Sequence, residues 1–335
     1  RVGEDHFVVI ADEATFNEEH LYECRETLQN VLSDSVYNVR VCFGIYRTDN
    51  MNESLSFMCD KASFAVASIK DDDTMLEAAI KYKTIVDEFD DAIKASEFKM
   101  YLQPQISAKT RRLTGAEALV RRIKPDGTIV SPIDFIPVYE KSGLISRLDR
   151  YIWEQAAAKL GEWKKVGINM SISVNISPKD FYYIDIFNTF AGLVKKYDIE
   201  PSNLKIEITE TTIMSDVPNL MGELEELRKA GFTIEMDDFG SGYSSLNTLK
   251  DMDVDVLKID MGETKNVKKS RIILASVIKM AKELNLLIIT EGVETEEQVD
   301  NLTKLGCDVF QGYYFSKAID VNEFEKRYLY RKKAG

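Results

Sequence analysis

Side chains able to bind a metal ion or a phosphate stand at the ends of successive apolar runs in this 335-residue chain. Each run leads into an acid, an amide or a lysine. The residues on which the runs finish are Glu117, Asn175, Glu207, Asp237-Asp238, Lys258, Glu291 and Gln311. One such residue in each strand-and-helix unit is what builds a site at one mouth of a barrel.

The oxygen-bearing members of this set suit a hard divalent cation. Glu117, Asn175, Glu207, Asp237 and Asp238 all offer carboxylate or amide oxygens, the ligands that Mg²⁺ and Mn²⁺ prefer. The adjacent aspartates predict a shared pair, in which one bridges two ions while its neighbour binds the second. Two ions about 3.5–4 Å apart can activate a water and stabilise the leaving oxygen of a phosphodiester.

Two further features accompany the acids. Lys258 has the inward parity of its strand, where it could orient the water or neutralise phosphate charge; the alternative is a structural bridge from Lys258 to a carboxylate. The glycine- and hydroxyl-rich segment 239–245 directly follows the aspartate pair, which favours a mobile loop that closes over a substrate.

From residue 98 onward, strand-like runs alternate with amphipathic helical stretches. The predicted strands are Lys99–Gln103, Leu113–Val120, Met170–Ile176, Leu204–Thr209, Thr233–Met236, Val256–Ile259, Leu286–Thr290 and Val309–Gly312. The predicted helices include Ile152–Trp163, Phe187–Tyr197, Leu220–Lys229, Arg271–Leu284 and Glu296–Leu305. This alternation predicts an α/β fold with a TIM-like (β/α)8 barrel. A doubly wound open sheet is the alternative, and the glycine-rich first turn typical of that fold is absent.

Strand phase predicts which side chains point into the barrel. In Leu204–Thr209 the acid Glu207 lies on the face opposite the leucine and isoleucines, which would pack on the helices. An inward acid requires a cation or hydrogen bonds. On the helices, the stripe of Trp153, Ala157, Leu160 and Trp163 predicts core packing against the barrel and no functional role.

Composition excludes several classes of protein. With 43 lysines and arginines against 56 acids, the formal charge of −13 disfavours nonspecific nucleic-acid binding. The four cysteines form no CxxC pair, which indicates buried, reduced thiols and a cytoplasmic protein. No run is long and apolar enough to span a membrane. The chain opens at Arg1 without a methionine, which indicates a fragment whose upstream part could carry a sensory domain or a membrane anchor.

Seven short segments, in order, resemble the EAL domain, the cyclic di-GMP phosphodiesterase family. They are EALVR (117–121), SVNIS (173–177), EITE (207–210), DDFGSGYSS (237–245), LKID (257–260), TEGVE (290–294) and QGYYFSKA (311–318). The resemblance covers residues 86–335. It implies hydrolysis of one phosphodiester bond of cyclic di-GMP to linear pGpG with Mg²⁺ or Mn²⁺, two ions per site, and a possible homodimer through this domain.

The resemblance also implies residue roles. Glu117, Asn175, Glu207, Asp237 and Asp238 would hold the metal ions. Glu291, Lys258 and Glu117 would be catalytic, with Glu291 acting either as general base or as metal ligand. The remaining implied roles are substrate binding by Gln103, Leu119, Arg121, Glu294 and Gln311, and anchoring of the loop after the aspartate pair by Glu210. Tyr139 replaces a usually small residue, which predicts a reshaped pocket edge.

Residues 1–85 resemble the C-terminal part of a degenerate GGDEF domain, the cyclase often fused upstream of EAL. The signature stands as Gly3-Glu4-Asp5-His6-Phe7, with Glu4 in place of a glycine and His6 in place of an acid. We expect this part, joined to the barrel by a helix, to make no cyclic di-GMP.

Three function classes remain open from the sequence. A complete set of acids favours a metal-dependent phosphodiesterase. A non-catalytic cyclic di-GMP receptor would bind without turnover. A barrel lyase or phosphatase acting on another substrate is disfavoured by the substrate-contact matches.

Overall fold

The computed structural model describes residues 81–213, 220–239, 253–261 and 267–330, together with short stretches before residue 63 (9–11, 16, 20–21, 23–24, 27, 43–48, 58–59 and 62). The cyclase-like signature at residues 3–7 and the loop 240–245 lie outside the described residues. Most of residues 1–85, the part that resembles a GGDEF domain, lies outside them as well. The chain divides into two compact units, one of Arg1–Phe89 with Pro137–Leu144 and one of Asp90–Ile136 with Ile145–Gly335.

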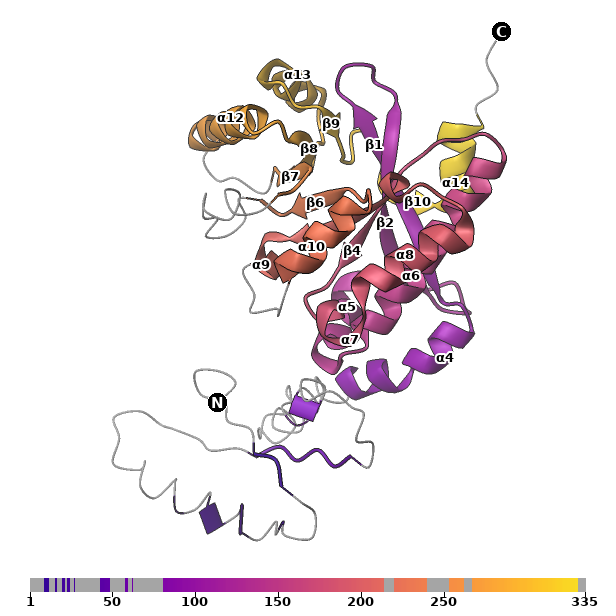
Figure 1. Ribbon diagram of the computed structural model, residues 1–335, viewed down its shortest axis with the longest axis vertical. Helices are drawn as coiled ribbons and strands as arrows, with labels where there is room; N and C mark the ends of the chain where they lie inside the picture. Colours follow the sequence, from indigo (N-terminus) through magenta and orange to yellow (C-terminus); the bar gives the residue numbers. More distant parts are fainter. Residues whose placement is uncertain are drawn as a thin grey trace. The chain divides into compact units, whose positions relative to one another are not determined.

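Eight strands of the second unit close into a barrel, with helices on its outside (Figure 1). The barrel strands are β1 (Phe98–Ser107), β2 (Leu113–Ile123), β4 (Ile172–Ile176), β5 (Leu204–Thr209), β6 (Ile234–Asp237), β7 (Val256–Asp260), β8 (Leu287–Glu291) and β9 (Val309–Phe310). Two short strands, β3 (Ile129–Val130) and β10 (Ile319–Asp320), extend the sheet. The TIM-like barrel expected from the sequence is therefore confirmed.

One strand of the barrel runs against the others. β1 pairs antiparallel with both β2 and β9, whereas the neighbours from β2 and β4 through to β9 pair in parallel. A tight turn joins β1 to β2, with Ser107 N donating to Arg112 O (2.9 Å) and Arg111 at φ 57°. Such a turn leaves no room for the crossover helix that parallel neighbours require.

The structure describes helices in both units, and those of the barrel unit lie on the outside of the barrel (Figure 1). They are α4 (Phe89–Lys94), α5 (Pro132–Ser142), α6 (Ile145–Lys165), α7 (Asp180–Tyr183), α8 (Ile186–Tyr197), α9 (Glu210–Ile213), α10 (Leu220–Lys229), α12 (Val267–Glu283), α13 (Glu296–Leu305) and α14 (Val321–Phe324), with one-turn helices at Pro201–Asn203 and Glu325–Leu329. Within the barrel unit, α6 packs on β4 and α8, and α12 packs on β8 and α13. The stripe predicted on α6 is buried as expected, with Trp153, Ala157, Leu160 and Trp163 all at most 3% exposed.

Local signals set the helix ends. Thr295 and Gln298 form a reciprocal capping box at the start of α13, and Gly306 at φ 94° ends the helix. Asp185 caps α8 by accepting from Asn188 N (3.0 Å). These residues set where α8 and α13 begin and where α13 ends.

The barrel interior is half polar and half apolar below the site. Glu235, fully buried on β6, accepts from Ser173 Oγ (2.7 Å) and pairs with Lys205 Nζ (2.9 Å). Val256, Ile289 and Val309 pack together on the strands that follow, β7, β8 and β9. This layer of side chains lies directly below the site in the barrel interior.

No helix among the described residues is long and apolar enough to cross a membrane. The described cysteines Cys24, Cys59 and Cys307 are free thiols. Cys307 is buried as expected, but Cys24 is exposed, so the expectation of buried thiols is wrong for that residue.

Candidate active site

The site is built around the side chain of Lys258, which is fully buried inside the barrel. Its Nζ lies 2.9 Å from Glu291 Oε1, 3.3 Å from Asp237 Oδ1 and 3.4 Å from Glu117 Oε2. It also contacts the Glu207 carboxylate. Four strands, β2, β5, β6 and β8, therefore direct an acid toward a lysine on a fifth, β7.

Strand register explains this convergence. Asn175 pairs with Glu207, Thr209 with Asp237, and Asp260 with Glu291, so the acids of neighbouring parallel strands reach the same end of the barrel. The carboxyl ends of parallel strands form the mouth where barrel enzymes carry their sites. The sequence prediction that these residues meet at one mouth agrees with this geometry.

The acids carry more negative charge than Lys258 neutralises. Burial, reinforced by the charge of Glu117, raises the pKa of Glu207 well above its usual range, although Lys258 opposes the shift. Burial likewise raises the pKa of Glu291 to about 8, against the lowering effect of Lys258. The four carboxylates overcome the effect of burial on Lys258 and raise its pKa well above the ordinary value.

Asp238 stands apart from the cluster around Lys258. Burial, and then the charges of Asp237 and Asp260, raise the pKa of its carboxyl. Its backbone is left-handed, with φ 57°, a conformation that few residues other than glycine adopt without strain. This turn of the chain directs two consecutive aspartates to different parts of the mouth.

Gln311, which directly follows β9, connects the acid Glu117 to two glutamines on β1. Gln311 Nε2 donates to the Glu117 carboxylate and to Gln103 Oε1 (3.4 Å), and Gln311 Oε1 accepts from Gln105 Nε2 (3.2 Å). Asn175 Nδ2 donates to Glu117 Oε1 (3.4 Å). Glu117 is thus held on both carboxylate oxygens by amide groups.

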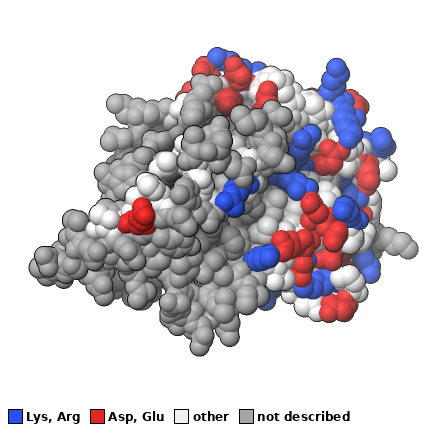
Figure 2. All heavy atoms as spheres, turned by 90° about the horizontal axis from the view of Figure 1, so that it is seen from below, with Lys and Arg blue, Asp and Glu red and all other residues white. Residues whose placement is uncertain are grey.

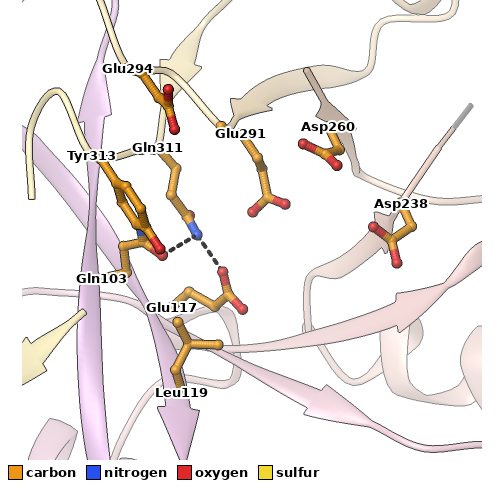
Figure 3. Close-up of a pocket in the computed structure, with 11 residues that line it drawn as sticks. Gln103, Glu117, Leu119, Asp238, Asp260, Glu291, Glu294, Gln311 and Tyr313 are labelled. Carbon is orange, nitrogen blue, oxygen red and sulfur yellow. Dashed lines mark hydrogen bonds between the residues drawn. The ribbon is translucent and has the colours of Figure 1, made fainter. Parts of the chain in front are cut away.

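An open cavity of about 410 Å³ lies over this cluster, and Figure 3 shows the acids and amides turned toward it. Its described lining consists of Gln103, Glu117, Leu119, Asp238, Asp260, Glu291, Gly292, Glu294, Gln311, Gly312 and Tyr313. Seven of the sequence-predicted site residues are among them: Gln103, Glu117, Leu119, Asp238, Glu291, Glu294 and Gln311. Glu207, Asp237 and Lys258 belong to the buried cluster beneath, and Asn175 reaches it through Glu117.

The structure places three predicted residues elsewhere. Arg121 lies beyond Leu119 on β2, donates to Val120 O (2.8 Å), sits 6.0 Å from the Tyr101 ring and does not line the described cavity. Glu210 is buried at the start of α9, and the loop it would anchor lies outside the described residues. Tyr139 is buried with its ring edge on Phe89 (4.9 Å) and is not part of the described lining, so the expected change at the pocket edge finds no support.

Sequence reasoning did not single out Asp260, Gly292, Gly312 or Tyr313. Asp260 had a usable signal, because it follows Lys258 by two residues and so shares its strand face. Tyr313 had none, since an aromatic after a strand usually packs in a core. In the structure Tyr313 is 61% exposed at the cavity wall.

The donor set fits divalent cations. Glu207 Oε2, Asp237 Oδ1 and Glu291 Oε1 are buried without a hydrogen-bond partner. Asp237 Oδ1 and Glu291 Oε1 each lie within ion-pair distance of Lys258 Nζ. Buried carboxylates that outnumber their cation are unfavourable unless protons or metal ions add positive charge. Among the described residues no group of three acids, histidines or cysteines is already arranged to hold a metal ion, and four of the carboxylates contact Lys258.

The family model of the EAL domain matches residues 86–318. This chain belongs to the EAL domain family.

Relatives of this EAL chain include proteins named for cyclic di-GMP. It is 28% identical to the bifunctional diguanylate cyclase/cyclic di-GMP phosphodiesterase MucR of Pseudomonas aeruginosa, over 96% of this chain and 50% of MucR. It is 36% identical to the signaling protein YkoW of Bacillus subtilis, over 70% of this chain and 30% of YkoW. The EAL chain thus spans half or less of the length of these relatives.

Solved EAL structures agree with the fold. The phosphodiesterase of P. aeruginosa MucR in complex with c-di-GMP superposes with a TM-score of 0.68 at 31% identity, over 72% of this chain and 99% of that one. The EAL domain protein of Listeria monocytogenes gives a TM-score of 0.61 at 31% identity, over 72% and 97% of the two chains.

Proposed function

We propose that this EAL domain hydrolyses one phosphodiester bond of cyclic di-GMP to give linear pGpG, with Mg²⁺ or Mn²⁺ bound at the mouth of the barrel. The observation that carries the proposal is the set of four carboxylates gathered on one buried lysine beneath an open cavity. Relatives named as cyclic di-GMP phosphodiesterases support the choice of substrate. They include PdeR of Escherichia coli, 30% identical over 72% of this chain and 37% of PdeR.

The chain's own residues define where two ions would be held. Glu117, Asn175, Glu207 and Asp237 would hold one ion, and Asp237 with Asp238 would share the second. Bound there, the ions supply a nucleophilic water at neutral pH and charge stabilisation for the phosphate. Because Asn175 uses Nδ2 to donate to Glu117, its Oδ1 is left for an ion.

The other site residues bind and orient. Lys258 holds a positive charge among the acids, where it would limit their mutual repulsion and stabilise the water or phosphate oxygen beside them. Glu291 faces the cavity 2.9 Å from that charge, and we assign it to accept the proton of the attacking water. Gln103 and Gln311 line one wall, where amides can bond the substrate's polar edges.

The negative charge of the chain is compatible with this substrate. On the face seen in Figure 2, basic and acidic side chains of the described residues are interspersed instead of gathering into a basic surface. Recognition of a dianionic nucleotide would therefore rest on the ions, Lys258 and Arg121. Arg121 would have to leave the Val120 carbonyl to reach a phosphate.

A hydrolysis assay tests the proposal. Purified protein is incubated with cyclic di-GMP and Mn²⁺, and the products are separated by chromatography. We expect linear pGpG, no product with a chelator, and no product from Glu117→Ala or Glu291→Gln. Wild-type turnover in either variant would overturn the assignment, and binding without turnover in the unaltered protein would show a receptor.

One variant resolves the role of Glu291. If it accepts a proton, Glu291→Gln keeps the Mn²⁺ affinity that the wild type has well below pH 8, where Glu291 is protonated, while turnover is lost. A loss of Mn²⁺ affinity would make Glu291 a metal ligand instead. The proposed homodimer is tested separately by sedimentation; Ile272 and Ile273 on α12 are exposed and would suit such a contact.

A further inference from the structure

An indole on the outside of the barrel is bonded to the main chain of a proposed metal ligand. Trp153 Nε1 on α6 donates to Asn175 O on β4 at 2.9 Å. Trp153 is fully buried, and its ring lies 4.8 Å from that of Phe190 on α8. Phe190 in turn meets Phe232 edge-on at 5.8 Å, so the ring that packs against the indole is itself held by a second ring.

The bond falls where the sheet gives β4 least support. β2 pairs with β4 only as far as Glu117 opposite Ser173. The last residues of β4 are registered with β5 alone, through Asn175 opposite Glu207 and Ile176 opposite Ile208. A strand end held on one side is free to tilt, and a tilt here moves the Asn175 amide relative to Glu117.

We propose that Trp153 is a positioning residue for the metal site, its indole N–H holding the end of β4 so that the Asn175 amide faces the ions. This inference rests on the proposed function. It assigns no contact between Trp153 and substrate or ion. Outer partners of metal ligands commonly contribute roughly 10–100-fold to metal affinity or activity.

The same helix provides a matched control. Trp163, also on α6 and 1% exposed, donates its indole N–H to Glu325 Oε1 at 2.8 Å. Glu325 belongs to the C-terminal one-turn helix and not to the site. Trp153→Phe and Trp163→Phe therefore remove the same atoms and one indole hydrogen bond each from the same helix, to a backbone carbonyl in the first case and to a carboxylate in the second. Only the first of these bonds reaches a strand that carries a proposed metal ligand.

The test measures Mn²⁺ binding by calorimetry without substrate. We expect Trp153→Phe to weaken Mn²⁺ binding about tenfold or more, and Trp163→Phe to stay within twofold of the wild type. Equal Mn²⁺ affinity in the two variants would overturn the inference and leave the proposed function intact. A wild type that binds no divalent cation would overturn both.

A second measurement avoids any change of shape at residue 153. The chain has two tryptophans, so Trp163→Phe leaves Trp153 as the single indole. In that variant, replacing the remaining tryptophan by 3-benzothienylalanine keeps the ring system and removes the N–H. We expect the analogue to lower Mn²⁺ affinity as Trp153→Phe does, with an unchanged circular dichroism spectrum. Unchanged affinity would show that Trp153 only packs.

The fluorescence of the same variant gives an independent readout. Mn²⁺ is paramagnetic and quenches nearby indoles, so the Trp153 emission of Trp163→Phe should fall during a Mn²⁺ titration and recover with a chelator. The Trp163 emission of Trp153→Phe should stay constant. A constant Trp153 signal, where calorimetry shows binding, would contradict the placement of the bound ion near the end of β4.

Discussion

Lys258 Nζ lies 2.9 Å from Glu291 Oε1, on the adjacent parallel strands β7 and β8. Three further acids reach the same ammonium from β2, β5 and β6. The side chain of Lys258 therefore ties five strands of the barrel together through their charges. A residue expected to serve chemistry also serves the architecture of the site.

Replacing Lys258 should destabilise the metal-free domain. Lys258→Met leaves four acids facing one another in a buried space, and removing one partner of a buried ion pair typically costs about 3–5 kcal/mol. We expect a loss of that size in the free energy of unfolding, measured by urea denaturation in a chelator. The matched control is Lys282→Met, whose pair with Asp308 is exposed and should contribute under about 1 kcal/mol. Equal losses in the two variants would contradict the central role of Lys258.

Metal binding should release protons. The pKa of Glu291 is raised to about 8, so below that pH the metal-free site holds a proton that a divalent ion would displace. Affinity for Mg²⁺ should rise with pH up to about 8 and then level off. Calorimetry in buffers of different ionisation enthalpy measures the protons released, and a buffer-independent heat would refute the prediction.

The same shift predicts how the metal-free domain responds to pH. The folded-state pKa of Glu291 lies above the unfolded value of roughly 4.3. The folded protein thus binds more protons between those values, and its stability falls as the pH rises from about 4.3 to 8. Unfolding followed in a chelator at several pH values checks this, and saturating Mg²⁺ should flatten the profile.

Gly312 should tolerate no side chain. A Cβ there would lie 2.2 Å from Val293 O and 2.3 Å from Val293 N, which are backbone atoms that cannot swing aside. Gly312→Ala must displace the neighbouring Gln311, and we expect loss of activity together with reduced thermal stability. Gly192→Ala on α8, where nothing lies within 4 Å, should instead stabilise the protein by up to about 1 kcal/mol. Full activity in Gly312→Ala would show that the strand end can move freely.

Arg121→Lys tests the substrate role inferred from the sequence. Lysine keeps the charge but loses the planar fork that binds two phosphate oxygens, a loss of about 1.5–3 kcal/mol. We expect KM for cyclic di-GMP to rise at least tenfold with kcat within about twofold. Unchanged steady-state kinetics would mean that Arg121 stays bound to Val120 O throughout turnover.

The sequence predicted elements with a strong local period accurately. Leu204–Thr209, Leu220–Lys229 and Glu296–Leu305 have the predicted bounds, because their apolar spacing and end residues agree. The short β3 and β10 were missed. A two-residue strand has no periodicity and forms only because a neighbouring edge is present.

That the acids converge at one mouth of the barrel could be predicted from the sequence, but their contacts could not. Strand parity identified Glu207 and Lys258 as inward-facing, yet parity says nothing about which inward side chains meet across a closed barrel. Trp153 shows the same limit. Helical spacing correctly predicted its burial, while the acceptor for its N–H depends on where α6 crosses β4.

The reversed first strand has a consequence for how the site comes into being. The β1–β2 hairpin alone sets Gln103 opposite Glu117, but Gln311 joins them only after β1 also pairs with β9, through Ile106 with Phe310 and Ser107 with Val309. This pairing joins β1 and β9, the first and last strands of the barrel along the chain. The contacts of Gln311 with Gln103 and Glu117 therefore depend on closure of the barrel, so a chain with an open barrel lacks this part of the site.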